Sequence, residues 1–109
     1  MKSKVETYLG FCVRSRKIAF GAEEAEQQKK DVFLLLFDET LGKSSRKCID
    51  RAKEKFGCMA FVCETGALGE LLHRPAVKAV AIKDKNLAMA IVSATQSEGQ
   101  FKLYSGGTD

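Results

Sequence analysis

The sequence has few of the residues on which most enzymes depend. Its single histidine, His73, stands just before Pro75 in a predicted loop, where a surface position is more common than a catalytic one. It contains no Gly-x-Ser-x-Gly elbow, no Walker loop and no dinucleotide-binding fingerprint. These absences argue against the common hydrolase and nucleotide-binding classes and predict a protein that is not an enzyme.

Long hydrophobic runs are also missing. The apolar run Val32–Phe37 is far shorter than the about 20 residues of a membrane-spanning helix. Residues 1–6 mix lysine with glutamate and lead into no apolar core of the signal-peptide type. We therefore expect a cytoplasmic protein with no membrane partner.

The cysteines lack the spacing of a metal site. Cys12, Cys48, Cys58 and Cys63 lie 36, 10 and 5 residues apart, whereas a zinc knuckle needs a gap of about two to four residues. The odd separation of Cys58 and Cys63 along an apolar run sends their side chains to opposite faces of a strand. We predict no metal, no cofactor, and free thiols that are mostly buried.

The positive charge is concentrated in one segment. The net charge is +4, and the segment from Lys43 to Lys55 alone holds six basic and two acidic residues, a difference of +4. Such a cluster on one predicted helix fits a surface that binds a polyanion. The alternative is a solvated helix face, which is the more common explanation of a charge cluster.

Hydrophobic periodicity predicts one domain of alternating helices and strands. The apolar run Ile18–Phe20, then Gly21, a polar helix-forming segment at 22–30 and the apolar run Val32–Phe37 form a strand–helix–strand pattern. Further helices are predicted near residues 4–14, 45–56, 66–72 and 85–94, and further strands at 58–63 and 77–82.

Almost wholly apolar strands imply a sheet that is covered on both faces. We predict an α/β fold, a three-layer α/β/α sandwich with a mixed sheet of about four strands, over residues 1–95. Residues 96–109 are predicted to be a polar, frayed C-terminal tail. If the strands at 18–20 and 59–62 run parallel, Gly21 and Gly66 lie at one sheet edge, where such sheets usually bind ligands.

Gly21 stands where a strand passes into a helix. A residue without a side chain lets an anion or another backbone come close, and Arg14, Arg16 and Lys17 precede it. A phosphate-bearing partner is therefore one interpretation. A glycine that only makes the turn is the other and more common one.

Four short blocks of sequence follow one another in a characteristic order along the chain. They are Gly21-Ala22-x-Glu24 after a basic segment, Leu-Leu-Leu-Phe-Asp38, Leu68-Gly69, and Ala81-Ile-Lys-Asp84. Together they resemble the kink-turn RNA-binding ribosomal protein family, and most of all its bacterial YlxQ-like branch. The resemblance covers residues 4–95 and implies the same three-layer sandwich. It also implies an RNA site made by the loop and helix start at Gly21 and by the segment from Thr65 to Gly69.

The family signature Gly-x-Asn-Glu-x-x-Lys is only partly present. It reads Gly21-Ala22-Glu23-Glu24-Ala25-Glu26-Gln27 here. Glu23 replaces the asparagine that reads base edges, and Gln27 replaces the lysine that meets the RNA backbone. Thr65-Gly66 stands where the family has Ser-Lys.

The resemblance assigns a role to each matching position. Gly21 lets the RNA backbone approach, and Glu24 accepts a hydrogen bond from a base edge. Phosphates are held by Arg14, Arg16 and Lys17. Leu68 and Gly69 form an apolar ledge for unstacked bases. The implied function is a non-enzymatic RNA-binding protein of ribosomal-protein type, whose partner is a structured RNA, ribosomal or another kink-turn RNA, with ribosome association in translation.

Two alternatives stay open. A family member that has lost kink-turn binding through Glu23 and Gln27 could act as a protein-interaction module near the translation machinery. An enzyme using the adjacent Asp38 and Glu39 is the other. No second acidic cluster pairs with them, however, and an aspartate at a strand end more often holds the next loop by hydrogen bonds to backbone amides.

Overall fold

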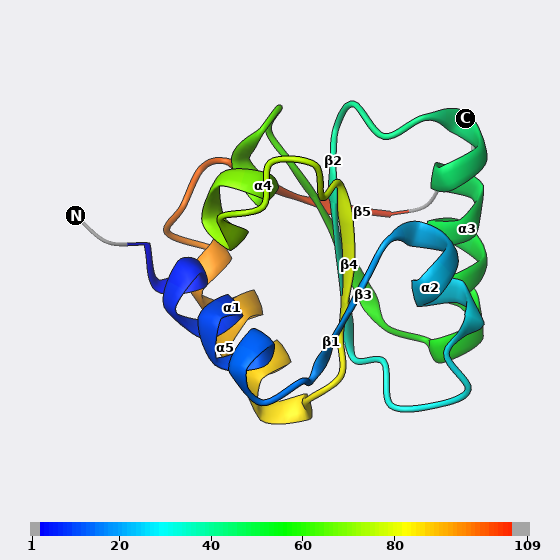
Figure 1. The fold of residues 1–109 in the computed structure, drawn as a ribbon, viewed down its shortest axis with the longest axis horizontal. Helices are drawn as coiled ribbons and strands as arrows, with labels where there is room; N and C mark the ends of the chain where they lie inside the picture. Colours follow the sequence, from blue (N-terminus) through cyan, green and yellow to red (C-terminus); the bar gives the residue numbers. More distant parts are fainter. Residues whose placement is uncertain (1–2, 106–109) are drawn as a thin grey trace.

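A five-stranded mixed sheet runs through the centre of the molecule, with helices on both faces (Figure 1). The structure is a computed structural model that describes residues 3–105. In chain order the elements are α1 (Lys4–Arg14), β1 (Ile18–Phe20), α2 (Ala22–Gln27), β2 (Leu34–Asp38), α3 (Lys43–Phe56), β3 (Met59–Cys63), α4 (Ala67–Leu72), β4 (Ala79–Ile82), α5 (Lys85–Thr95) and β5 (Phe101–Tyr104). Within the described range, no helix combines the length and apolar character needed to cross a bilayer.

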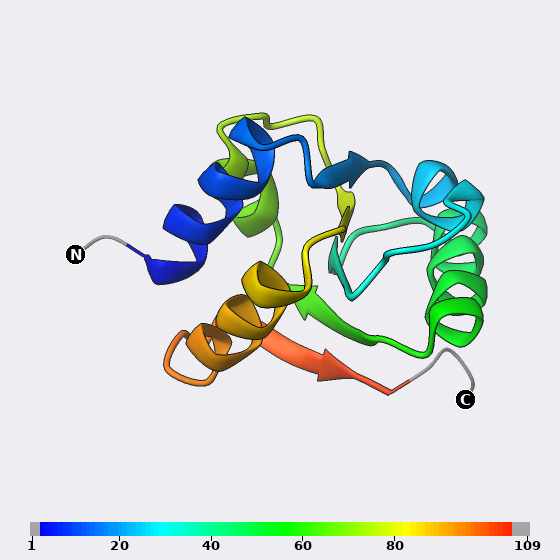
Figure 2. The same ribbon diagram turned by 90° about the horizontal axis from the view of Figure 1, so that it is seen from below.

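The predicted three-layer α/β/α sandwich is confirmed. Helices α1, α4 and α5 cover one face of the sheet, and α2 and α3 cover the other (Figures 1 and 2). Strand β2 is buried throughout because its side chains alternate between the two layers: Leu34 and Leu36 pack toward α1, α4 and α5, whereas Leu35 and Phe37 pack toward α2 and α3.

Strand directions bring three loops to one edge of the sheet. The spatial order is β1-β4-β2-β3-β5, with β2 and β3 parallel and β4 antiparallel to both β1 and β2. Strands β1, β2 and β3 therefore point the same way. This confirms the expectation that Gly21 and Gly66, which follow β1 and β3, lie at one edge.

Several helix boundaries differ from the predicted ones. Helix α3 begins at Lys43, two residues earlier than predicted, with Gly42 at its N-cap. Helix α2 ends at Gln27 instead of residue 30. Beyond this end, the Lys55 ammonium donates hydrogen bonds to the carbonyl oxygens of Glu26 (3.0 Å) and Gln28 (2.7 Å), which therefore have a partner outside the helix. Asp84 is the N-cap of α5 and accepts the Leu87 amide at 2.9 Å, and Gly57 ends α3 in the left-handed conformation.

The expected frayed tail contains a fifth strand, β5. It pairs antiparallel with β3 and forms an edge of the sheet (Figure 2). Phe101 is buried, and Tyr104 packs edge-on against Phe37 and donates a hydrogen bond to Asp50 at 2.6 Å. These contacts between distant segments have no signal in the local sequence. Residues 106–109, which end the predicted tail, lie outside the described range.

The cysteines lie where their spacing predicts. Cys12, Cys48 and Cys63 are buried and Cys58 is half-buried. Cys63 belongs to the layer of α1, α4 and α5, whereas Cys58 packs against the layer of α2 and α3. Burial, reinforced by nearby Asp38, raises the pKa of Cys63 to about 12, so this thiol stays protonated and unreactive at neutral pH.

Candidate nucleic-acid interface

Backbone hydrogen bonds connect the loops at the edge of the sheet where β1, β2 and β3 end. The Gly21 amide donates to the Ala79 carbonyl at 2.7 Å and ties the β1–α2 junction to the start of β4. The amides of Asp38 and Glu39 donate to the carbonyls of Lys78 (2.8 Å) and Cys63 (2.9 Å). The loops after the three parallel strands and the loop that enters β4 are thereby held together. We call this surface the Gly21 edge.

Gly21 is both required for the turn and open to its surroundings. Its φ of +100° is a conformation that residues with side chains rarely adopt. Apart from its chain neighbours, no described residue has a heavy atom within 4 Å of the position that a Cβ would take there. The turn alone explains the glycine, and the space around it is open.

The family-signature side chains that follow Gly21 are available to a ligand. Glu23, Glu24 and Gln27 are exposed, while Ala22 and Ala25 carry the packing of α2. Within residues 3–105, none of the three exposed side chains hydrogen bonds to the protein. The structure therefore brings these three residues together with Gly21, as the sequence predicts.

Asp38 is committed to holding the loops. It is only 3% exposed, and its Oδ1 accepts the Thr40 amide (2.9 Å) and hydroxyl (2.6 Å), while Oδ2 accepts the Gly66 amide (2.7 Å). Burial raises the pKa of Asp38, but these hydrogen bonds and the charge of Lys78 outweigh it and hold the pKa below its usual range. The alternative in which Asp38 holds the next loop is the one observed.

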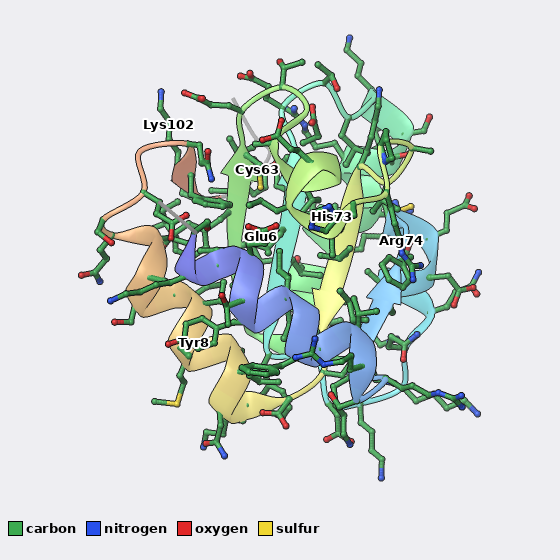
Figure 3. The ribbon with its side chains drawn as sticks, turned by 60° about the vertical axis from the view of Figure 1, so that its left-hand side comes forward. Glu6, Tyr8, Cys63, His73, Arg74 and Lys102 are labelled. Atoms are coloured by element: carbon green, nitrogen blue, oxygen red, sulfur yellow. The ribbon has the colours of Figure 1, made fainter. Side chains whose placement is uncertain are left out.

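Thr65 is bound to the loop that follows β2. Its amide and hydroxyl both donate to Glu39 Oε2, at 2.8 and 2.7 Å, and Gly66 is the N-cap of α4. The two bonds hold the pKa of Glu39 below its usual range. Thr65 and Glu39 also line a cavity of about 310 Å³ together with Lys102 (labelled in Figure 3).

The predicted apolar ledge is absent. Leu68 is completely buried in the core beneath α4, and Gly69 is buried as well. A Cβ on Gly69 would lie 3.1 Å from the Arg74 carbonyl oxygen and from two Pro75 atoms. Gly69 therefore lets the loop after α4 pack closely, and neither residue offers a surface to bases.

Arg16 and Lys17 do not converge with Gly21. Both precede β1, and the Lys17 carbonyl accepts the Lys83 amide at 2.8 Å at the opposite end of the strand. At about 3.3 Å per residue, roughly 13 Å of extended chain separates Lys17 from Gly21. The predicted cluster of phosphate contacts beside Gly21 is therefore not formed by these two residues.

Two cations at this edge were missed by sequence reasoning. Arg74 is exposed, and its guanidinium carbon lies 4.5 Å from the centroid of the Phe20 ring, next to Gly21. Lys78 is exposed at the start of β4. A basic residue beside a lone proline and another at a strand start were visible in the sequence. Only the antiparallel pairing of β1 with β4 places them here.

The carboxylates at the end of β2 already have hydrogen-bond partners. The described residues hold no group of three or more His, Cys, Asp or Glu side chains arranged to bind a metal ion. The Asp38 and Glu39 carboxylates already accept hydrogen bonds from Thr40, Thr65 and Gly66. What remains free is a set of exposed polar side chains around an open glycine.

Comparison with known proteins identifies a shared fold but no family. No family model matches this chain, and no curated protein does. Among solved structures, a protein of unknown function from Bacillus halodurans superposes with a TM-score of 0.75 at 17% sequence identity, covering 87% of this chain and 99% of that one. At this identity the likeness establishes a shared fold.

Proposed function

We propose that this protein is a non-enzymatic, RNA-binding protein of ribosomal-protein type, and that it binds structured RNA of the kink-turn kind at the Gly21 edge. The observation that carries the proposal is the open glycine itself, flanked by side chains with no protein partner among the described residues. The resemblance to the kink-turn RNA-binding family supports it, because Glu24, which matches the family signature, is exposed beside the open Gly21.

The edge offers the chemistry that folded RNA needs. Glu24 can accept a hydrogen bond from a base amino group, and the Arg74 guanidinium, already stacked on Phe20, presents a flat face to an unstacked base. Lys78 can meet a phosphate. Because Glu23 and Glu39 stand at the same edge, general attraction to polyanions is weak there, and shape and hydrogen bonding must supply most of the specificity.

The testing experiment restores the two family residues that differ. Glu23→Asn with Gln27→Lys should tighten binding to a kink-turn RNA. The asparagine regains base-edge hydrogen bonds worth about 1–3 kcal/mol, by analogy with base contacts in DNA. The lysine adds one backbone cation, so the slope of log affinity against log salt should steepen by up to about one. Affinity is measured at two salt concentrations for a kink-turn RNA and for a plain duplex of equal length.

A charge-matched variant separates recognition from bulk charge. Glu54→Asn with Gln96→Lys makes the same charge change at exposed positions on α3 and just after α5. It should strengthen binding to both RNAs slightly and equally. If the two double variants behave alike, or if the first leaves both RNAs bound equally weakly, the Gly21 edge is not a kink-turn site.

A second candidate function is a protein-interaction module. Phe33, Met59 and Met89 are 36%, 42% and 62% exposed and line an apolar cavity of about 360 Å³ beside α5. Exposed apolar side chains gathered around one hollow are typical of protein-binding surfaces. The ultraviolet absorbance ratio of the purified protein before and after a high-salt wash discriminates the two, because copurified nucleic acid favours RNA binding.

A further inference from the structure

A groove of about 440 Å³ lies between α1 and the C-terminal end of α4. Glu6, Gly10 and Arg14 line it from α1, and His73 and Arg74 line it from the other side. Figure 3 shows Glu6 and His73 close together between the two helices, with Arg74 farther along toward β1. Phosphate contact was expected of Arg14 and base stacking is proposed for Arg74, but neither role places a ligand between the two side chains in this groove.

Two guanidinium groups face the groove with their hydrogen-bond donors unused. The Arg14 guanidinium carbon lies 4.9 Å from the centroid of the Phe11 ring, and that of Arg74 lies 4.5 Å from the centroid of Phe20. Stacking fixes the plane of each group but leaves its N–H edge free. Within residues 3–105, neither guanidinium forms a hydrogen bond or an ion pair.

The acidic side chain in the groove is already paired. Among the described residues that line it, Glu6 is the only carboxylate. Its Oε2 lies 2.8 Å from His73 Nε2. With the Glu6 carboxylate engaged by the imidazole, the two arginines leave the groove with a net positive character.

Gly10 keeps the groove open without being needed for packing. It lies inside α1, where glycine is about 1 kcal/mol less favourable than alanine. A Cβ there would meet only Arg14 Nη1, at an ordinary contact distance of 3.8 Å. Neither backbone strain nor crowding requires a glycine here, and only a side chain longer than alanine's would fill the space beside Arg14.

We propose that the α1–α4 groove binds one phosphate group of the RNA chain, held between the guanidinium groups of Arg14 and Arg74. Guanidinium forks match phosphate oxygens in geometry and charge. Arg74 also stacks on Phe20, the residue before Gly21, so the groove continues the Gly21 edge toward α1. The inference rests on the proposed function and extends the RNA path beyond the kink-turn contact.

The first test compares two neighbouring arginines. Arg14→Gln should lower the salt slope of kink-turn RNA binding by up to about one, the value of one lost phosphate contact. Arg16→Gln is the matched control, because Arg16 is exposed two residues away and does not line the groove. If both variants lower the salt slope equally, the effect comes from overall charge and not from the groove, and the inference is overturned.

The second test closes the groove and leaves its charge unchanged. Gly10→Met fills the space beside Arg14 and should weaken binding as Arg14→Gln does, whereas Gly10→Ala should bind RNA normally and unfold at a higher denaturant concentration. Glu6→Gln removes the carboxylate and should tighten binding. Normal RNA affinity in Gly10→Met, with the fold intact by circular dichroism, would contradict the inference.

A failure of the groove and a failure of the proposed function give different results. If Glu23→Asn with Gln27→Lys tightens RNA binding while Arg14→Gln and Gly10→Met change nothing, the function stands and the groove inference falls. If no RNA binds at all, a titration with inorganic phosphate tests the groove alone. Saturable shifts of the Gly10 and His73 amide resonances that disappear in Arg14→Gln would support a phosphate site. If no such shifts occur, the groove does not bind phosphate.

Discussion

Asp38 is the residue on which the shape of the candidate interface depends. It lies at the end of β2 and joins two loops, because one carboxylate oxygen accepts from Thr40 and the other from the amide of Gly66. Gly66 starts α4, so a single buried side chain sets the distance between the β2 loop and the helix start. Its ionised form is the one that can accept all three hydrogen bonds.

Replacing Asp38 should make stability less dependent on pH. In Asp38→Asn one oxygen is replaced by an amide that faces the Gly66 N–H, so two donors oppose each other and the variant should lose about 1–3 kcal/mol at pH 7. Because the folded pKa of Asp38 is lowered, its contribution is present above about pH 4, the unfolded value, and disappears as the pH falls through the folded pKa.

Urea unfolding of both proteins at pH 7 and in acid checks this expectation. The stability difference between them should be largest at pH 7 and should shrink as Asp38 becomes protonated. Thr40→Val serves as the control, because it removes only the hydroxyl bond and leaves the Gly66 contact intact. A difference that stays constant with pH would mean that Asp38 is not the ionised acceptor described here.

Single residues were predictable where the cause is local. An aspartate after a buried strand predicts loop hydrogen bonds, and Asp38 forms them. Leu68 was predicted to face bases, but an apolar side chain on a short helix is more often core, and it is fully buried. Arg74 reaches Phe20 only through strand pairing, a relation that no local pattern encodes.

At the scale of elements, α1 is anchored by the turn that follows α5. The Glu98 carboxylate accepts the amides of Lys4 (3.1 Å) and Val5 (3.3 Å), and Ser3, the N-cap of α1, donates its hydroxyl to the same carboxylate. These amides begin a helix and have no intrahelical partner. Glu98 therefore connects the N-terminal helix to a segment more than ninety residues away.

Removing this connection should destabilise the protein measurably. Glu98→Ala leaves the Lys4 and Val5 amides to solvent and should lower the free energy of unfolding by about 1 kcal/mol, within the 0.5–2 kcal/mol typical of helix caps. Glu98→Gln, which keeps an acceptor but no charge, should lie between. Chemical denaturation measures both. An effect no larger than that of Glu54→Ala, an exposed glutamate of α3, would contradict the capping role.

Elements with a strong apolar stripe were predicted well, and their ends less so. In α1, which was predicted at residues 4–14, Val5, Leu9 and Cys12 are fully buried and Tyr8 is half-buried, so helical spacing identifies its inner face. Helix α3 begins two residues before its predicted start, with Gly42 at the N-cap in an extended conformation. Strand β5 has an exposed Leu103 and few apolar residues, so only its pairing with β3 defines it.

At the scale of the whole molecule, alternating apolar runs were enough to predict the three layers, and strand order was not accessible. Continuous burial of β2 on two faces follows from its sequence. The antiparallel insertion of β4 between β1 and β2 does not. That insertion decides which cations stand at the Gly21 edge, so the candidate site could be predicted only in part.

Three basic side chains of helix α3 bind other parts of the protein at its surface. Arg51 pairs with Glu26 at 2.6 Å, Lys55 binds carbonyls at the end of α2, and Arg46 donates to the Glu39 carbonyl at 3.0 Å. The helix covers the face of the sheet opposite α1 and α4 (Figure 1). The charge cluster that the sequence marks as a polyanion surface thus has a structural explanation, which favours the solvated-face alternative.

Loss of a lysine at the Gly21 edge and loss of a lysine on α3 should therefore have different effects on RNA binding. Lys78 stands at the Gly21 edge, whereas Lys53 lies on α3. Lys78→Gln should weaken kink-turn RNA binding and reduce the salt slope by up to about one, since one phosphate contact is lost. Lys53→Gln carries the same charge change and should alter neither quantity. Titrations at two salt concentrations measure both. Should Lys53→Gln abolish binding while Lys78→Gln has no effect, α3 is the RNA surface, and the open glycine at the sheet edge serves only its turn.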